Sequence, residues 1–323
     1  MSTIQDLGRW GYLSQGVPLS GAMDTLSARI ANLAVGNTVH EAIIEFTYGN
    51  AAFRTEGNLL LAYSGDGAVL TTGSLLLPAD RPVYVPSGTE IRLSNNPRGC
   101  RTYLAVAGGW EAAEVLGSRS TYTTASFGGY EGRALLAGDM LHAGADRSDI
   151  TEEWYRSLQG TAINYPHWAI ARWLFVPADR NTVRVVPARE FTWFEGKSVV
   201  DLLSDPFTVS TKSNRMGYHL EGPAIHRSVS SELLSTAVTP GTLQVTGHGG
   251  LLLLMADCQT TGGYPRIAQV AAVDMPLCAQ LKPGDTIYFK EISRHEAEKL
   301  YIHRENQLNK LATALAIRTP TIL

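Results

Sequence analysis

The first half of the chain contains a series of short apolar runs separated by turn-forming residues. Between residues 42 and 141 the runs are AIIEF, NLLLAYS, PVYVP, EIRLS and RTYLAVAG, and Gly, Pro, Asn and Asp stand between them. Runs of this length and spacing are typical of strands in a β-barrel or sandwich, whereas βαβ units would need helices between the strands. We therefore expect a mainly β fold with minor α content.

A turn followed by a strand recurs in the two halves of the chain. PSGTEIRL at 86–93 resembles KPGDTIYF at 282–289, and AGDML at 137–141 is a shorter version. The match suggests two related β units, although common turn chemistry alone could produce it. A length of 323 residues also favours two packed subdomains over one core. The expected parts are an N-terminal β subdomain at 1–147, a crossing segment at 148–177, a C-terminal β subdomain at 178–292 and a helix at 293–317.

Two helices are predicted by their capping signals and apolar spacing. Asp24 is a suitable N-cap, the apolar residues that follow recur at helical spacing, and Gly36 supplies a stop, which predicts a helix over 25–35. Near the C-terminus, Ser293 and Glu296 form a capping box before a second periodic run. This predicts a long helix over 294–316.

Composition excludes several classes of partner and compartment. A net charge of −3 and a pI near 6.2 give no electrostatic reason to expect a nucleic acid or an anionic membrane as partner. The N-terminus lacks the apolar region of a secretory signal, and no apolar run reaches the ~20 residues of a membrane-spanning helix. Three cysteines cannot all pair with one another and show no metal-ligand spacing. We expect a cytoplasmic protein without a metal site.

The stretch LLMADCQTTGGYPRIA at 253–268 has the strongest signature of a binding site. Leu251 to Met255 is a continuous apolar run of the kind found in buried strands, and polar residues follow it directly. A polar loop held between two buried strands is a common place for binding residues. The candidates are Asp257, Gln259, Thr260, Thr261, Gly262, Gly263 and Arg266. The alternative is a tight hairpin whose Thr and Gly residues are solvated.

Two further polar segments are candidates for the same chemistry. In the segment KSNRMGY at 212–218, Arg215 offers fixed donors for an oxyanion, while Ser213, Asn214 and Gly217 provide neutral contacts and close backbone approach. His248 has flexible glycine neighbours and could transfer protons. A solvated surface turn is the alternative for the first segment, and His248 has no partner carboxylate that the sequence reveals.

Several motifs of known chemistry are missing. Glu195-Gly196-Lys197-Ser198 matches the end of a phosphate-binding P-loop, but Phe191 stands where the first Gly is required. There is no GxSxG or HExxH motif, and no Met-Lys-Met type site for covalent biotin. If the reaction uses ATP or biotin, another domain must supply part of the machinery.

Taken in order, several segments resemble the biotin-dependent carboxyltransferase family, also called allophanate hydrolase subunit 2. The resemblance covers nearly the whole chain to about Phe289. It rests on TIQDLGR at 3–9, GVPLSGAMD at 16–24, ANLAVGN at 31–37, YLAVAGG at 103–109, LGSRST at 116–121, SNRMGY at 213–218 and QTTGGYPRIA at 259–268.

The resemblance implies two cyclophilin-like β-barrel subdomains with a few helices and a C-terminal helix. Within the family the closest described function is that of the C subunit of 5-oxoprolinase, which acts with the A and B subunits, the latter of the kinase-inhibitor type. That assembly opens the lactam of 5-oxoproline to glutamate at the expense of ATP, and the isolated C chain is expected to be inactive. Other relatives imply alternatives: carboxyl transfer from biotin to urea in a urea carboxylase/allophanate system, or binding that antagonises a kinase inhibitor.

Either reaction needs donors that stabilise a developing oxyanion, and Arg215, Arg266 and the backbone around Gly262-Gly263 could supply them. The hypothesis is that residues 213–217 and 259–266 converge on one anion-handling pocket. Asp257 or His248 would then transfer the proton.

Overall fold

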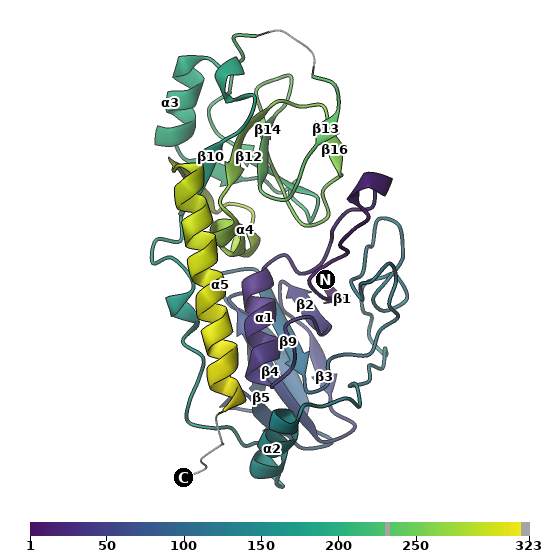
Figure 1. Cartoon of the computed structure of the whole chain (residues 1–323). Helices are drawn as coiled ribbons and strands as arrows, with labels where there is room; N and C mark the ends of the chain where they lie inside the picture. The colour runs from purple at the N-terminus through teal and green to yellow at the C-terminus, as the bar shows by residue number, and fades with distance from the viewer. Residues whose placement is uncertain (230–232, 318–323) are drawn as a thin grey trace. The chain divides into compact units, whose positions relative to one another are not determined.

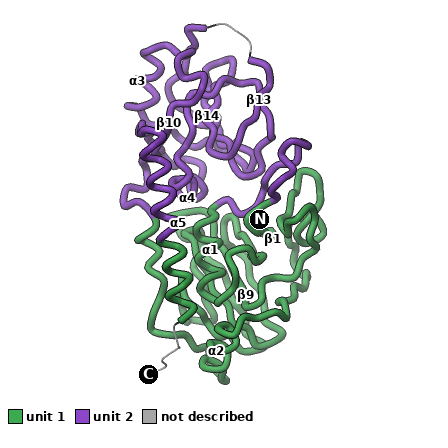
Figure 2. Tube along the Cα trace, viewed as in Figure 1, with its two compact units in different colours: residues 1–8, 24–175, 307–323 green, residues 9–23, 176–306 purple. Residues whose placement is uncertain are grey.

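A computed structural model describes residues 1–229 and 233–317 of the chain. It contains two compact units, each built from several segments (Figure 2). Unit 1 comprises residues 1–8, 24–175 and the chain from 307 onward, and unit 2 comprises residues 9–23 and 176–306. The linear boundaries proposed from the sequence did not anticipate that residues 9–23 belong with unit 2, and as subdomain limits they remain a prediction.

Unit 1 contains two antiparallel sheets (Figure 1). The first sheet has five strands, in the order β1 Ser2–Gln5, β2 Ile43–Thr47, β9 Arg101–Val106, β4 Leu59–Gly65 and β7 Val83–Val85. The second sheet has four strands, in the order β3 Ala52–Arg54, β8 Glu90–Asn95, β5 Ala68–Thr72 and β6 Leu75–Leu76. The alternating runs of the sequence therefore form the predicted strands, and in this unit their pairing gives two sheets in place of one closed barrel.

The two faces of the five-stranded sheet differ in polarity. On one face Ile4, Ile44 and Leu104 belong to the same hydrophobic cluster as Leu70 and Ile91 of the second sheet. Packing of these apolar side chains holds the two sheets together. Successive residues of a strand point to opposite faces, so the residues between these apolar ones line the other face.

The other face carries a row of polar residues. Thr3 lies opposite Glu45, Glu45 opposite Tyr103, and Tyr103 opposite Ser64. All four residues are buried. A polar row that crosses four neighbouring strands and is covered from solvent needs internal hydrogen-bond partners.

Both edge strands of the five-stranded sheet are covered by loop backbone. Along β1, the amide of Thr121 donates to Ile4 O (2.9 Å) and that of Leu135 donates to Ser2 O (2.8 Å). Along β7, Tyr84 and Asn164 exchange two backbone hydrogen bonds. Peptide groups that an edge strand would otherwise present to solvent are thus paired within unit 1.

Helix α1, Thr25–Ala34, confirms the first predicted helix. The Asp24 side chain accepts a hydrogen bond from the Ser27 amide (2.9 Å), as an N-cap should. A second helix, α2 Asp149–Leu158, lies in the segment that the sequence suggested only as a crossing. Its buried residues Thr151, Trp154 and Leu158 follow helical spacing, but the charged residues between them obscured the pattern.

Unit 2 is a closed barrel of seven strands. Their order is β10 Thr182–Pro187, β17 Arg266–Val270, β14 Thr242–Val245, β15 Leu251–Leu254, β12 Gly217–Glu221, β11 Phe207–Val209 and β18 Thr286–Glu291. Parallel pairing of β10 with β18 closes the barrel, and the other pairs are antiparallel. The apolar run at 251–255 contains the strand β15, as predicted, and its Leu251, Leu253 and Met255 side chains belong to the barrel core.

The recurring turn motif has the same backbone form in both units. Gly88 (φ 81°) precedes β8, and Gly284 (φ 90°) precedes β18. A positive φ is favourable for glycine, which explains the residue at both turns. Gly138 shares this conformation (φ 96°), but the residues that follow it do not form a strand.

The remaining elements are short except for the last helix. They are α3 Gly196–Ser204, α4 Met275–Gln280, the small sheet of β13 Thr236–Ala237 with β16 Thr261–Gly262, and the 3-10 turns Leu13–Gln15, Arg172–Leu174, Phe191–Trp193 and Ala272–Asp274. Helix α5 spans Arg294–Ala316, and the Glu296 amide donates to Ser293 Oγ (3.1 Å), which confirms the predicted C-terminal helix and its cap. Among residues 1–229 and 233–317, no helix combines the length and hydropathy that a membrane crossing requires.

Candidate functional site

Two of the residues selected from the sequence form a buried ion pair in unit 2. Arg215 directly precedes β12, and Asp257 follows β15; the opposition of Gly217 to Leu254 brings them together. Arg215 Nε donates to Asp257 Oδ2 (2.8 Å), and Nη2 donates to Oδ1 (3.1 Å). Arg215 is 7% exposed and Asp257 3%. In this bidentate geometry the two opposite charges neutralise each other in a position that is buried from solvent.

The same pair fixes the segment at residues 9–23. Arg215 Nη2 also donates to Gly21 O (2.6 Å), and the Ser20 amide donates to Ala256 O (3.0 Å), the residue before Asp257. The segment is closed at its base by the Arg9 amide, which donates to Leu19 O (2.7 Å). The family-like segments at 16–24 and 213–218 therefore meet at one end of the barrel strands.

Arg266 pairs with a carboxylate that the sequence did not suggest. Its Nε and Nη2 donate to Glu190 Oε2 and Oε1, both at 2.7 Å, and Nη1 donates to Ala237 O (3.0 Å). Hydrogen bonds from the Arg266 guanidinium lower the pKa of Glu190 below its ordinary value, against the opposing effect of burial. Glu190 thus stays ionised and compensates Arg266.

The strand directions separate Arg215 from Arg266. Arg215 lies before the start of β12, level with the end of β15, whereas Arg266 starts β17 opposite Gln244, near the end of β14. Because β14 and β15 are antiparallel, these two positions lie at opposite ends of the barrel strands. The structure therefore does not bring the two arginines into the single pocket expected from the sequence. Each guanidinium is held by its own carboxylate.

The other candidate residues in the segment at 212–218 shape a turn. Ser213 Oγ accepts from the His219 amide (3.2 Å), and Asn214 Oδ1 accepts from the Met216 amide (2.8 Å). Gly217 is the first residue of β12. These contacts favour the turn reading for Ser213 and Asn214, while a direct role in binding stays a prediction.

The remaining candidate residues, at 259–263, form β16 and its flanks. Thr261 and Gly262 pair with Ala237 and Thr236, and Thr260 O accepts from the Val238 amide (3.0 Å). A Cβ at Gly262 would lie 2.7 Å from Gln244 Nε2, so the Gln244 side chain would have to shift to admit one. Gln259 and Gly263 are exposed.

His248 is exposed in the turn between β14 and β15. Within residues 1–229 and 233–317 its ring has no hydrogen-bond or ion-pair partner. A role in proton transfer stays a prediction.

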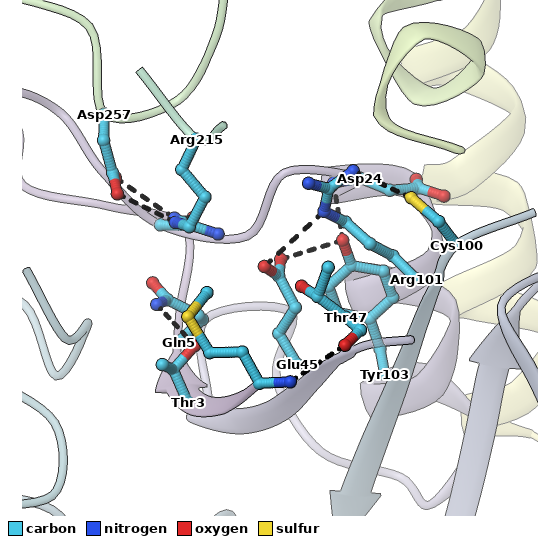
Figure 3. Close-up of polar contacts among 12 residues, drawn as sticks. Thr3, Gln5, Asp24, Glu45, Thr47, Cys100, Arg101, Tyr103, Arg215 and Asp257 are labelled. Atoms are coloured by element: carbon cyan, nitrogen blue, oxygen red, sulfur yellow. Dashed lines mark hydrogen bonds and ion pairs between the residues drawn. The ribbon is translucent and has the colours of Figure 1, made fainter. Parts of the chain in front are cut away.

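A second polar network lies on the buried polar face of the five-stranded sheet in unit 1 (Figure 3). The Tyr103 hydroxyl donates to Glu45 Oε2 (2.9 Å) and accepts from the Asp24 amide (2.8 Å), so it links β9 and β2 to the start of α1. Arg101 Nε lies 3.8 Å from Glu45 Oε1. Glu45 is therefore a buried carboxylate paired with Tyr103 and Arg101.

Electrostatics keep the tyrosine of this network protonated. Burial raises the pKa of the Tyr103 hydroxyl well above its ordinary value, and the Glu45 and Asp24 carboxylates raise it further. Tyr103 is completely buried and Glu45 is 1% exposed. The hydroxyl is thus a fixed donor to Glu45.

A third cluster joins two of the family-like segments within unit 1. Asp6 Oδ1 accepts from Ser118 Oγ (2.7 Å) and from the Gly8 amide (2.8 Å), and its Oδ2 accepts from the Arg119 amide (2.6 Å). The Asp6 amide donates to Ser120 Oγ (2.9 Å). Asp6 thereby fixes the loop at 116–121, and Arg119 Nη1 pairs with Glu41 (3.2 Å).

Comparison with known proteins identifies the family. The sequence model of the carboxyltransferase domain, subdomain A and B, matches residues 15–291. The chain belongs to this carboxyltransferase family.

Relatives within the family differ in name and in length. The chain is 35% identical to the 5-oxoprolinase C subunit of Escherichia coli K12 over 316 residues, which cover 97% of this chain and 96% of the relative. It is 30% identical to urea amidolyase of Saccharomyces cerevisiae over 93% of this chain, but spans only 16% of that protein. The crystal structure of Kluyveromyces lactis urea carboxylase superposes with a TM-score of 0.84 at 27% identity, over 96% of this chain and 28% of that one.

Sequence reasoning missed Tyr103 as part of the second polar network, and it missed Asp6 and the Ser118–Ser120 side chains as the third cluster. For the second network a signal was present, because polar residues stand two positions apart at Thr3 and Gln5 in β1 and at Glu45 and Thr47 in β2. Such alternation is usually read as a solvated face. Among the described residues, no group of three or more His, Cys, Asp and Glu side chains is arranged to hold a metal ion.

Proposed function

We propose that the chain is the C subunit of an ATP-dependent 5-oxoprolinase, which opens the lactam of 5-oxoproline to glutamate together with the A and B subunits. The observation that supports this most strongly is the similarity to the C subunit of E. coli 5-oxoprolinase from end to end of both chains. Urea amidolyase, by contrast, carries the matching region as 16% of a longer protein. The identity to the E. coli subunit is also higher, 35% against 30% for urea amidolyase, which favours the 5-oxoprolinase reading.

The chemistry of the proposed reaction sets what the complex must supply. A lactam amide is a poor electrophile, and phosphorylation of its oxygen by ATP would convert that oxygen into a good leaving group. Groups that donate hydrogen bonds to the developing oxyanion would then lower the barrier. The sequence of this chain has no P-loop.

Within this proposal, the ion-paired arginines position backbone. Arg215 and Asp257 compensate each other, and Arg215 holds Gly21 O; Arg266 is occupied by Glu190 and Ala237 O. A guanidinium in such contacts orients a loop at the edge of the barrel and keeps its amide groups in place for a ligand. His248, which is exposed, remains the proposed proton-transfer group.

The proposal is tested by reconstitution. The chain is mixed with the A and B subunits from the same organism, and glutamate release from 5-oxoproline is measured with and without ATP. The expected result is ATP-dependent glutamate release that requires all three proteins, with none from this chain alone. If the A and B subunits release glutamate equally well without this chain, it is not their third subunit.

A second candidate function is carboxyl transfer from biotin to urea. The family's carboxyltransferase domain and the TM-score of 0.84 with urea carboxylase favour it. In this reading the biotin is carried by a partner. Activity would then require a biotin-bearing protein and would be blocked by avidin, whereas avidin should leave 5-oxoproline hydrolysis unaffected.

A further inference from the structure

Ser20 has an unusual backbone conformation in the segment that Arg215 holds. Its φ is 54°, in the left-handed region that L-residues other than Gly, Asn and Asp seldom adopt, and Gly21 follows with φ 83°. The backbone contacts on both sides impose this shape: the Ser20 amide donates to Ala256 O, and Gly21 O accepts from Arg215. A strained conformation persists where its surroundings determine it in this way.

The Ser20 side chain carries a second unfavourable feature. Ser20 is only 4% exposed, and its hydroxyl has no hydrogen-bond partner in the part of the chain that the structure describes. A buried hydroxyl without a partner is costly, because it loses its hydrogen bonds to water. Glycine at this position would remove both the strain and the buried hydroxyl.

Ser126 shows that the backbone conformation alone does not require a buried hydroxyl. It has the same φ of 54°, but it is exposed, so its hydroxyl can bind water. Its conformation needs no explanation beyond a surface turn. Ser20 and Ser126 therefore share a backbone conformation but differ in burial. The Ser20 hydroxyl is buried without a hydrogen-bond partner among the described residues, and a ligand could supply that partner.

We propose that Ser20 is a substrate-contacting residue whose hydroxyl donates a hydrogen bond to the carbonyl oxygen of an amide-containing substrate. The inference rests on the proposed enzymatic function. Ser20 is only 4% exposed in this structure, so the contact requires the segment at residues 9–23 to shift when the substrate binds.

The surroundings of Ser20 favour an uncharged polar group over a free anion. Arg215, the cation fixed beside the segment, is already compensated by Asp257. A hydroxyl both donates and accepts, which suits the C=O and N–H groups of an amide. The lactam of 5-oxoproline and the two amide groups of urea share this unit, so the same contact fits either proposed substrate.

The test compares three variants of the full chain, assembled with its partner proteins. Ser20→Ala removes only the hydroxyl, Ser20→Gly also removes the backbone strain, and Ser126→Gly is the control for relief of strain elsewhere. Melting temperature, kcat and KM for 5-oxoproline, and calorimetric binding of 5-oxoproline and of urea are measured for each. The two ligands distinguish a lactam substrate from urea.

We expect Ser20→Gly and Ser126→Gly both to raise the melting temperature by a few degrees. Ser20→Ala and Ser20→Gly should weaken binding of the preferred ligand, or lower kcat/KM, at least tenfold, while Ser126→Gly stays within twofold of the wild type.

Wild-type binding or kinetics in the folded Ser20 variants would overturn the inference, even if the assembly hydrolyses 5-oxoproline. If the wild-type assembly binds urea but not 5-oxoproline, the proposed function fails, and loss of urea binding in the Ser20 variants would still support the contact. Binding of neither ligand by the wild-type assembly would overturn both.

Discussion

The hydroxyl of Tyr103 bridges the carboxylate of Glu45 and the backbone amide of Asp24, at 2.9 and 2.8 Å. One side chain therefore ties two neighbouring strands of the first sheet to the N-terminus of α1. Because all of these groups are buried, each depends on the tyrosine for a hydrogen bond that water cannot replace.

Replacing Tyr103 with Phe should destabilise the protein by about 1–3 kcal/mol, because it leaves the Asp24 amide and one Glu45 oxygen without this partner. The free energy of unfolding in urea measures the loss. Tyr122→Phe is the matched control, since the Tyr122 hydroxyl makes no side-chain hydrogen bond within the described part of the chain. A loss in Tyr103→Phe no larger than in the control would contradict the bridging role.

Removing one charge of the Arg215–Asp257 pair should lower the free energy of unfolding more than removing both. Arg215→Met or Asp257→Leu alone leaves a buried charge uncompensated, at a cost of about 3–5 kcal/mol. The double variant should lose less than the sum of the two single losses. A double-mutant cycle in urea measures the coupling, and Arg294→Ala, which removes an exposed ion pair with Glu298, should change stability little. Additive losses would show that the two charges do not depend on each other.

The Glu190–Arg266 pair should make stability fall in acid. The folded-state pKa of Glu190 is lowered, so its contribution is present above the unfolded value, about 4.3, and is lost as the pH falls through the folded value. Glu190→Gln should therefore be less stable than the wild type at pH 7 and should lose less stability between pH 5 and pH 3. Unfolding curves at both pH values measure this difference. Equal acid sensitivity in the variant and the wild type would argue against the pair.

Gly108 should tolerate a side chain less well than Gly138. Both have a positive φ, which penalises alanine by about 1–2 kcal/mol. A Cβ at Gly108 would lie 2.2 Å from Gly144 O, whereas at Gly138 it would meet nothing within 4 Å. Gly108→Ala should therefore cost about 1–3 kcal/mol more than Gly138→Ala, from overpacking. Thermal melting of the two variants, side by side, tests the ranking.

Local signals in the sequence predicted most of the secondary structure. The Asp24 cap defined α1, the Ser293 cap defined α5, and the alternating runs became strands, because each of these signals acts between residues a few positions apart. Helix α2 was not predicted, because its charged residues outnumber the three residues that it buries. In unit 1 the strands were predicted, but their pairing into two sheets was not.

The site was harder to predict because its contacts join distant parts of the chain. Arg215 and Asp257 were both selected, yet nothing local indicates that they neutralise each other across 42 positions. The partner of Arg266, Glu190, lies 76 positions away. Such pairings depend on the order and direction of the strands. The same two properties place the two arginines at opposite ends of the barrel strands.

The paired edges of the five-stranded sheet bear on how the protein behaves at high concentration. Loop backbone at Thr121, Leu135 and Asn164 occupies hydrogen-bonding positions along β1 and β7, and the barrel of unit 2 is closed. A second molecule that sought to extend either structure by adding a strand would first have to displace these loops. Fibril-like self-association through those strands should therefore require local unfolding, and deletions in the loops at 121–135 or 159–164 are the changes expected to promote it.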